Sequence, residues 1–223
     1  MQSNKHVIIF SHGFGVRKDA RGLFTDIADE FHDVGKVMFD YNVFEENNNT
    51  IIVRPLDEQA EVLREVLLET KKIYPGAVID IVAHSQGGVV VALSKPAGVR
   101  KTILLAPPVD MNFDRMVGMF KSRPGTLIDM NGVSRLSRKD GSITLVPASY
   151  FDGRKNIKPM ELYEELSNTT ELIIVKASED EVLGDTDFSK LSRVKVLNID
   201  GDHNFTGEAR KKLLEVIGGI VSA

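Results

Sequence analysis

The chain has 223 residues, enough to bury a core without disulfides or metal ions, and domains of this size commonly form one unit. Hydrophobic residues make up 42% and charged residues 27%, which excludes the low-hydrophobicity composition of disordered chains. A net charge of −4 gives no long-range attraction for nucleic acid or anionic lipid, and the lack of cysteine excludes disulfides and thiolate chemistry. The expected partner is therefore a small molecule, whereas the oligomeric state stays open.

The N-terminal apolar run, residues 7–10, is too short for the core of a signal peptide. No segment approaches the roughly 18 consecutive apolar residues that a membrane helix requires. We therefore expect no membrane association and, by default, a cytoplasmic location.

Short apolar runs alternate with amphipathic stretches, which predicts an α/β fold. Strands are predicted at residues 6–10, 36–41, 78–83, 102–106, 171–176 and 195–199. Helical patterns follow the first strand, open after Pro55, begin at Gln86 and begin again near Thr206. The expected architecture is a mostly parallel sheet of about six strands with helices on both faces.

One region departs from this alternation of strands and helices. From residue 107 to about 170, some sixty residues replace the helix that would lead back to the next strand, and such a long excursion is typical of a functional insertion. We interpret residues 109–170 as a cap over a core formed by residues 1–108 and 171–223. Four apolar side chains at helical spacing in the cap are candidates for an acyl or aryl pocket, although ordinary packing explains them equally well: Phe113, Met116, Met119 and Phe120.

Ser85 lies in a run of small residues, AHSQGG at residues 83–88, between a predicted strand and the helix that begins at Gln86. A serine nucleophile must be exposed, close to a base and close to N–H donors for the developing oxyanion. A tight strand-to-helix turn meets these needs when Ala83 and Gly87 are small. A capping serine in an ordinary turn would look the same, so the wider context decides.

That context consists of three further segments, each placed after a predicted strand. A glycine-rich turn, SHGFG at residues 11–15, follows the first strand and can lie beside the Ser85 turn. Asp180 follows the penultimate strand, and His203 follows the last one. The chain order is then Ser, Asp, His, the order of a hydrolase triad on such a sheet.

The chain resembles the α/β-hydrolases over essentially its whole length. The resemblance rests on the HGFG turn at residues 12–15, the AHSQGG turn around Ser85, which is called the nucleophile elbow in that family, and the GDH sequence at residues 201–203. The resemblance implies Ser85 as nucleophile, His203 as general base and Asp180 as the acid that orients it. It also implies that the backbone N–H groups of Phe14 and Gln86 form the oxyanion hole.

The chain departs from the family pattern in two ways. Ala83 replaces the usual first glycine of the elbow, and the antiparallel first strands of the fuller fold are missing. Small esterases look most similar, including cinnamoyl and feruloyl esterases with an insert in a comparable position. Haloalkane dehalogenases and epoxide hydrolases are disfavoured, because they would carry Asp at position 85.

We therefore expect a serine carboxylesterase that hydrolyses small carboxylic esters through an acyl-enzyme, with no metal or organic cofactor. A thioesterase, amidase or peptidase would use the same triad, and a non-catalytic binding protein of this fold is the alternative outside enzymes.

Two histidines beside the site are interpreted as supports that hold the turns by hydrogen bonds: His12 and His84. Three basic positions in the insertion are interpreted as exposed cap surface: Arg135, Arg138 and Lys139.

Overall fold

A computed structural model describes residues 5–222, except for the side chains of Phe113 and Met116. In chain order its elements are β1 (His6–Ser11), α1 (Leu23–Asp29), β2 (Gly35–Met38), β3 (Val43–Glu45), η1 (Glu46–Asn48), β4 (Thr50–Ile52), α2 (Leu56–Ile73), β5 (Val78–His84), α3 (Gln86–Ser94), β6 (Lys101–Leu105), α4 (Phe113–Lys121), β7 (Val133–Ser137), β8 (Ile143–Pro147), α5 (Ala148–Arg154), α6 (Pro159–Ser167), β9 (Glu171–Ala177), β10 (Val194–Ile199) and α7 (Glu208–Ser222).

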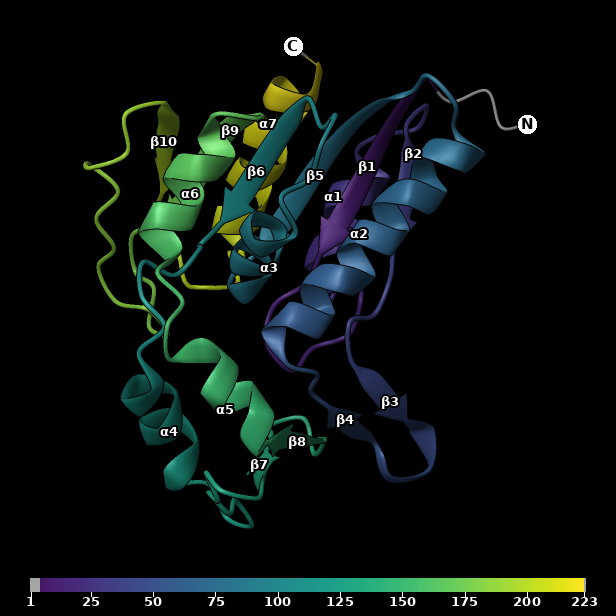
Figure 1. Cartoon of the computed structure of the whole chain (residues 1–223). Helices are drawn as coiled ribbons and strands as arrows, with labels where there is room; N and C mark the ends of the chain where they lie inside the picture. The colour runs from purple at the N-terminus through teal and green to yellow at the C-terminus, as the bar shows by residue number, and fades with distance from the viewer. Residues whose placement is uncertain (1–4, 223) are drawn as a thin grey trace.

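The main sheet has six parallel strands in the order β10-β9-β6-β5-β1-β2 (Figure 1). These are the six strands predicted from the apolar runs. The chain leaves β1 toward β2 on one side and then returns to place β5 on the other side of β1. Open parallel sheets bind ligands at the carboxyl ends of strands where the order reverses in this way, so β1 and β5 mark the expected site.

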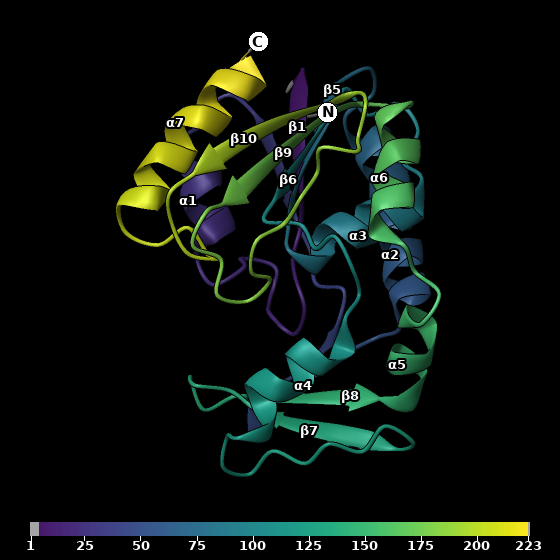
Figure 2. The same ribbon diagram turned by 90° about the vertical axis from the view of Figure 1, so that its left-hand side faces the viewer.

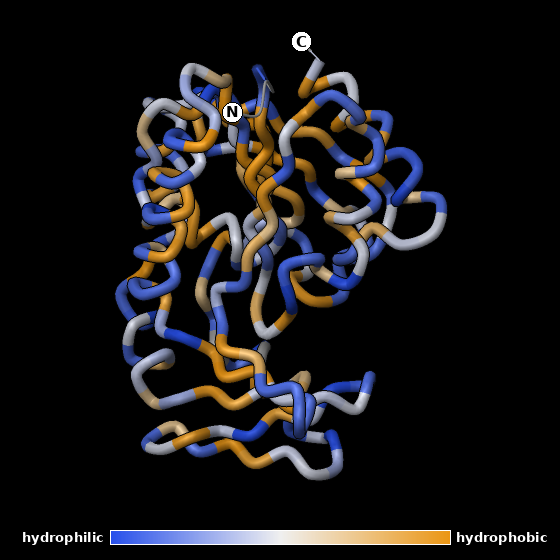
Figure 3. Tube along the Cα trace, turned by 90° about the vertical axis from the view of Figure 1, so that its right-hand side faces the viewer, coloured by the Kyte–Doolittle hydropathy of each residue, from blue (hydrophilic) through white to orange (hydrophobic). Residues whose placement is uncertain are grey.

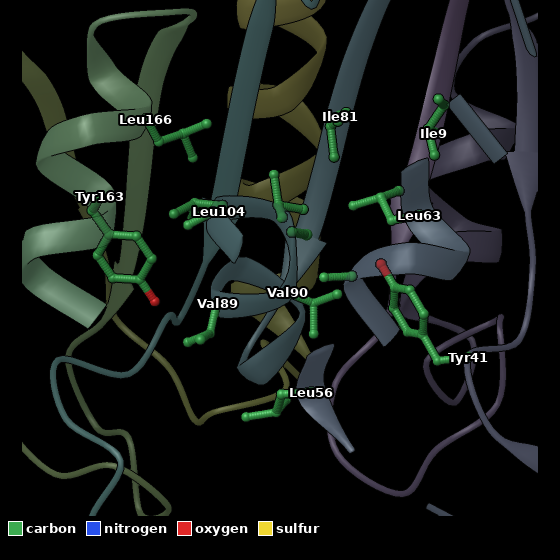
Figure 4. Close-up of a cluster of buried hydrophobic side chains, with 14 of the residues drawn as sticks. Ile9, Tyr41, Leu56, Leu63, Ile81, Val89, Val90, Leu104, Tyr163 and Leu166 are labelled. Carbon is green, nitrogen blue, oxygen red and sulfur yellow. The ribbon is translucent and has the colours of Figure 1, made fainter. Parts of the chain in front are cut away.

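Helices cover both faces of the sheet, as predicted. Figure 2 shows α2, α3 and α6 on one face and α1 and α7 on the other. Hydrophobic residues run along the central strands (Figure 3), and the buried residues of α1, α2, α6 and α7 pack against them. On the α2–α3–α6 face, Leu63 from α2, Val90 from α3 and Leu166 from α6 converge on the strands (Figure 4).

The helix before β9 differs from the sequence prediction. The apolar pattern gave no crossover helix in this region, but α6 packs against α3 and β9 and acts as one. Tyr163 and Leu166 are its buried residues facing the core, and the Tyr163 hydroxyl donates a hydrogen bond to the carbonyl of Pro108 at 3.1 Å. Its apolar face is only a few residues long, which hides it among the irregular residues of the insertion.

A second, smaller sheet lies beyond the carboxyl ends of the main strands, in the order β3-β4-β8-β7 (Figures 1 and 2). β4 pairs in parallel with β8, so residues 43–52 join the insertion in a single sheet. The apolar pattern predicted no strands at residues 43–52, but β3, η1 and β4 form a hairpin there, with residues 45–49 exposed at its tip. Pairing with β8, which is distant in sequence, buries Thr50 and Ile51 and stabilises this short hairpin.

Within the described range 5–222, no helix combines the length and apolar character needed to cross a membrane.

Candidate active site

Ser85 lies at the turn between β5 and α3 with a strained backbone, at φ 55° and ψ −129°. Left-handed φ values are unfavourable for residues other than glycine and persist only where the surroundings impose them. Here the Ser85 amide donates to the carbonyl of Leu105 at 2.8 Å, and the Gly88 amide donates to the Ser85 carbonyl at 3.0 Å. The turn is therefore held at the carboxyl end of β5 by bonds on both sides of the serine.

The turn after β1 packs directly against the Ser85 turn, as the sequence predicts. Ser11 is in register with Ala83 across the two strands, and its hydroxyl donates to the Gly87 carbonyl at 2.9 Å. A methyl group on Gly87 would lie only 2.8 Å from the carbonyl oxygen of His12 and would overlap that of Ser11. The close approach of the two turns therefore requires glycine at position 87.

Ser85, His203 and Asp180 form a continuous hydrogen-bond chain. His203 Nε2 lies 2.9 Å from Ser85 Oγ, and His203 Nδ1 lies 2.7 Å from Asp180 Oδ2. The other carboxylate oxygen of Asp180 accepts from the amides of Val182 at 2.9 Å and Leu183 at 2.7 Å. Because an ionised carboxylate only accepts, His203 carries its proton on Nδ1 and leaves Nε2 free to accept the serine proton.

Burial separates Asp180 from the other acids in its loop. Asp180 and His203 are only 8% and 5% exposed, whereas Asp185 is 98% exposed at its side chain and pairs with Lys176 at 3.3 Å. Glu181 does reach the site, but its Oε2 accepts from the main-chain amide of His203 at 3.1 Å and not from the imidazole. Asp180 is thus the acid that contacts the ring.

The predicted oxyanion donors, the amides of Phe14 and Gln86, belong to the two turns that meet at Ser85. Gln86 is the first residue of α3, and Phe14 follows β1 within the glycine-rich turn. Neither amide donates to an acceptor among the described residues. Both residues line the same cavity as Ser85, so the amides of an N-terminal helix turn and of a glycine-rich turn are available there.

A buried polar network behind the elbow was not predicted from the sequence. The Gln86 side chain accepts from the Tyr150 hydroxyl and lies 3.4 Å from the Gln59 amide oxygen, to which it donates. Gln59 in turn donates to the carbonyl of Arg54 at 2.7 Å. Burial raises the pKa of Tyr150, which keeps its hydroxyl protonated and donating. These partners come from α2 and α5, and no local pattern in the sequence signals their meeting.

His12 and His84 hold the turns by hydrogen bonds, as interpreted from the sequence. His12 Nε2 accepts from the Tyr41 amide at 3.0 Å, and the other ring nitrogen contacts the Gly13 carbonyl at 2.9 Å. His84 Nε2 lies 2.9 Å from the main-chain carbonyl of His203. Burial, assisted by the nearby His203, lowers the pKa of His84 to about 3, and burial also lowers that of His12.

Ser85 and His203 open into a cavity of about 470 Å³ between the main sheet and the insertion. Met119 and Phe120 of α4 line this cavity, and their role in binding an acyl or aryl group stays a prediction. The side chains of the other two pocket candidates, Phe113 and Met116, lie outside the described residues. Within the described residues, no group of three or more His, Asp or Glu side chains is arranged to hold a metal ion.

The interpretation of Arg138 as exposed surface is wrong. Arg138 is partly buried and lines the cavity, with its Nε donating to Thr144 Oγ1 at 2.9 Å and its Nη2 to the Phe14 carbonyl at 3.4 Å. The physical reason is that side chains alternate between the two faces of β7, and this alternation continues to residue 138, just beyond the end of the strand. Ser134 and Leu136 are buried on one face, and Arg138 shares their parity.

Solved structures with the same arrangement of elements are esterases and hydrolases. Est1E from Butyrivibrio proteoclasticus superposes with a TM-score of 0.70 at 19% identity, over 99% of this chain and 88% of its own. The α/β-hydrolase fold is the fold of this chain. The esterase domain of a Rhodothermus marinus protein matches with a TM-score of 0.67 at 16% identity, covering 98% and 87% of the two chains.

The Pyrococcus furiosus esterase PF2001 matches with a TM-score of 0.65 at 13% identity, over 99% and 82% of the two chains. Neither a protein-family model nor a curated protein sequence matches. At these identities the likeness establishes the α/β-hydrolase fold alone. The chemistry has to be argued from the site itself.

Proposed function

We propose that this protein is a serine carboxylesterase that hydrolyses small carboxylic esters through an acyl-enzyme. The observation that carries the proposal is the hydrogen-bond chain from Ser85 Oγ through His203 to Asp180, beneath an open cavity. A serine hydroxyl becomes nucleophilic when a neutral imidazole accepts its proton, and the buried carboxylate stabilises the resulting imidazolium.

In the proposed acylation step, Ser85 Oγ attacks the ester carbonyl carbon while His203 Nε2 takes the hydroxyl proton. The carbonyl oxygen acquires negative charge and accepts from the amides of Phe14 and Gln86. As the tetrahedral intermediate collapses, the carbon–oxygen bond to the alcohol breaks and His203 returns its proton to the departing alkoxide. Water then repeats the sequence on the acyl-enzyme and releases the carboxylic acid and Ser85.

The proposed substrate class follows from the fold and from the size of the cavity. Est1E, with which this chain shares its fold, has also been solved with ferulic acid bound, and a cavity of about 470 Å³ suits a small acyl or aryl ester. A thioesterase, amidase or peptidase with the same triad, or a binding protein of this fold, stays an alternative. The cytoplasmic location expected from the sequence likewise stays a prediction.

A fluorophosphonate probe tests the proposal directly, because it reacts covalently with an activated serine. We expect one label per chain on Ser85 by peptide mass spectrometry and turnover of p-nitrophenyl acetate. Ser85→Ala abolishes both, and Ser94→Ala serves as the control because Ser94 is buried and donates to the Val91 carbonyl. A label on another serine, or full activity in Ser85→Ala, contradicts the proposed nucleophile.

A panel with a thioester and an anilide beside the ester separates the alternatives that share the triad. Faster thioester or anilide turnover would replace the carboxylesterase by the corresponding hydrolase. A protein that binds ligands without either label or turnover would be a binding protein of this fold.

A further inference from the structure

The cavity beside Ser85 is lined by more basic than acidic side chains. Three acids face it, Asp110, Asp140 and Glu181, against six basic residues. The basic residues are Arg21, Arg115, Arg123, Arg138, Lys139 and Arg154. The chain as a whole carries a net charge of −4, so this basic lining is opposite in sign to the rest of the molecule.

Arg138 is a basic cavity residue that contacts the turn after β1. Its guanidinium contacts the carbonyl of Phe14, whose amide is a proposed oxyanion donor. A side chain at Gly15 would overlap the Arg138 guanidinium, so glycine at that position leaves room for it. The guanidinium carbon lies 5.3 Å from the centre of the Phe14 ring and 4.8 Å from that of Phe120. Arg138 is therefore held between the oxyanion turn and the cap helix α4.

Within the described residues, no carboxylate forms an ion pair with Arg138, and Asp140 acts on it only through its charge. The acid nearest along the chain, Asp140, lies 3.6 Å from Arg21 in an exposed ion pair. Glu181 instead accepts from the main-chain amide of His203. Burial, together with the charges of Arg21 and Arg123, lowers the pKa of Arg138 to about 10, so the guanidinium is still charged at neutral pH.

Arg138 also retains unused donors that can reach the cavity. A guanidinium has five N–H groups, and Arg138 uses Nε on Thr144 and one N–H of Nη2 on Phe14. Its Nη1 has no acceptor among the described residues. A partly buried cation without a directly paired carboxylate is costly, and a ligand carboxylate can accept from the free edge of such a fork.

We propose that Arg138 binds a carboxylate carried by the substrate, so that the preferred ester is anionic. The inference rests on the proposed ester hydrolysis at Ser85 and adds the chemical class of its substrate. The carboxylate accepts hydrogen bonds from Arg138 Nη1 while the ester carbonyl lies in the oxyanion hole, because both groups line one cavity. Arg21 and Arg123 line the same cavity and add longer-range attraction, although the ion pair with Asp140 offsets part of the charge of Arg21.

Two matched pairs of esters test this inference. On the acyl side, p-nitrophenyl hydrogen glutarate is compared with p-nitrophenyl pentanoate, which has a similar length, the same leaving group and no charge. On the alcohol side, 4-acetoxybenzoate is compared with 4-acetylphenyl acetate. We expect the anionic member of at least one pair to have the higher kcat/KM, and the pair that discriminates identifies which half carries the carboxylate.

The Arg138→Gln variant should reduce the ratio of anionic to neutral kcat/KM by about tenfold to a hundredfold, mainly through KM. Arg138→Lys keeps the charge and should retain part of the preference. Arg135→Gln is the matched control, because Arg135 lies outside the cavity and donates to the Gly125 carbonyl. An unchanged ratio in Arg138→Gln, or a wild-type preference for the neutral ester in both pairs, overturns the inference.

Calorimetry on the Ser85→Ala protein separates this inference from the proposed catalysis. Monomethyl glutarate should bind more tightly than methyl pentanoate, and added salt should reduce the difference. If the wild-type enzyme hydrolyses neither ester but the binding preference persists, the proposed function fails and the anion site stands. If it hydrolyses esters without any preference for the anion, the anion site fails and the proposed function stands.

Discussion

The imidazole of His84 holds the main chain of His203, with its Nε2 at 2.9 Å from the His203 carbonyl oxygen. The next residue, Ser85, meets the imidazole of His203 itself at 2.9 Å. Two consecutive residues of the elbow therefore fix both the backbone and the ring of the same histidine. Because a carbonyl only accepts, His84 must keep its proton on Nε2, and the lowered pKa of about 3 keeps its ring neutral.

The lowered pKa of His84 predicts a loss of stability in mild acid. Below pH 6.5 the unfolded chain protonates His84 while the folded chain does not, so the free energy of unfolding falls as the pH decreases from about 6.5 toward 3. One such group contributes a slope of up to about 1.4 kcal/mol per pH unit. Urea unfolding at several pH values measures this slope.

The His84→Gln variant removes the titrating group and retains an N–H donor, so its stability should depend less steeply on pH over this window. His32→Gln is the control, because His32 is exposed on the surface. Equal slopes in His84→Gln and the wild-type protein would show that His84 does not cause the acid sensitivity.

The contact between Asp180 and His203 predicts a large catalytic effect. Asp180→Asn should lower kcat by about 10⁴, because an amide in place of the carboxylate favours the wrong tautomer of His203 and no longer stabilises its charged form. Glu181→Gln, which alters only the bond to the His203 amide, should cost far less. Steady-state kinetics on p-nitrophenyl acetate compares the two. A larger loss in Glu181→Gln or in Asp185→Asn would reassign the acid.

Packing between the turn after β1 and the Ser85 turn predicts the effect of a single methyl group. Gly87→Ala should push the Ser11–His12 backbone away from the elbow, destabilise the fold by about 1–3 kcal/mol and lower kcat/KM. Gly88→Ala is the matched control, because its methyl group would meet the flexible end of Leu104 at 3.3 Å. Urea unfolding and ester kinetics on both variants test this, and similar behaviour of the two would contradict the packing argument.

The cap residues that line the cavity should determine which acyl chain fits. Met119→Ala and Phe120→Ala should shift the preference among p-nitrophenyl esters of increasing length more than they change the rate on the acetate. Val133→Ala, at an exposed position of β7, is the control. A uniform loss on every ester would instead indicate damage to folding or to the triad.

The sequence predicted the six main strands and the positions of Ser85, Asp180 and His203 because these depend on local signals. Buried parallel strands read as apolar runs, and the polar residues directly after them converge on one edge of the sheet. β3, β4 and β7 were missed because strands of three to five residues gain their stability from partners distant in the chain. Without β7, the inward parity of Arg138 could not be read.

The hydrogen-bond network of Gln59, Gln86 and Tyr150 could not be predicted from the sequence for a similar reason. Each of the three is an ordinary residue in its own helix, and only the packing of α2, α3 and α5 brings their polar groups together. Hydrogen bonds between helices follow no sequence period.

The shared sheet β3-β4-β8-β7 limits how this cap can be exchanged or lost as a module. Deleting residues 109–170 would remove β8 and leave β4 with an unpaired edge, where the chain could pair with another copy of itself. It would also remove α6, which covers one face of the main sheet beside α3. A transplant onto another scaffold would fail in the same way unless residues 43–52 travelled with it. An exchange of this smaller sheet would therefore require changes in two segments that lie far apart in the chain.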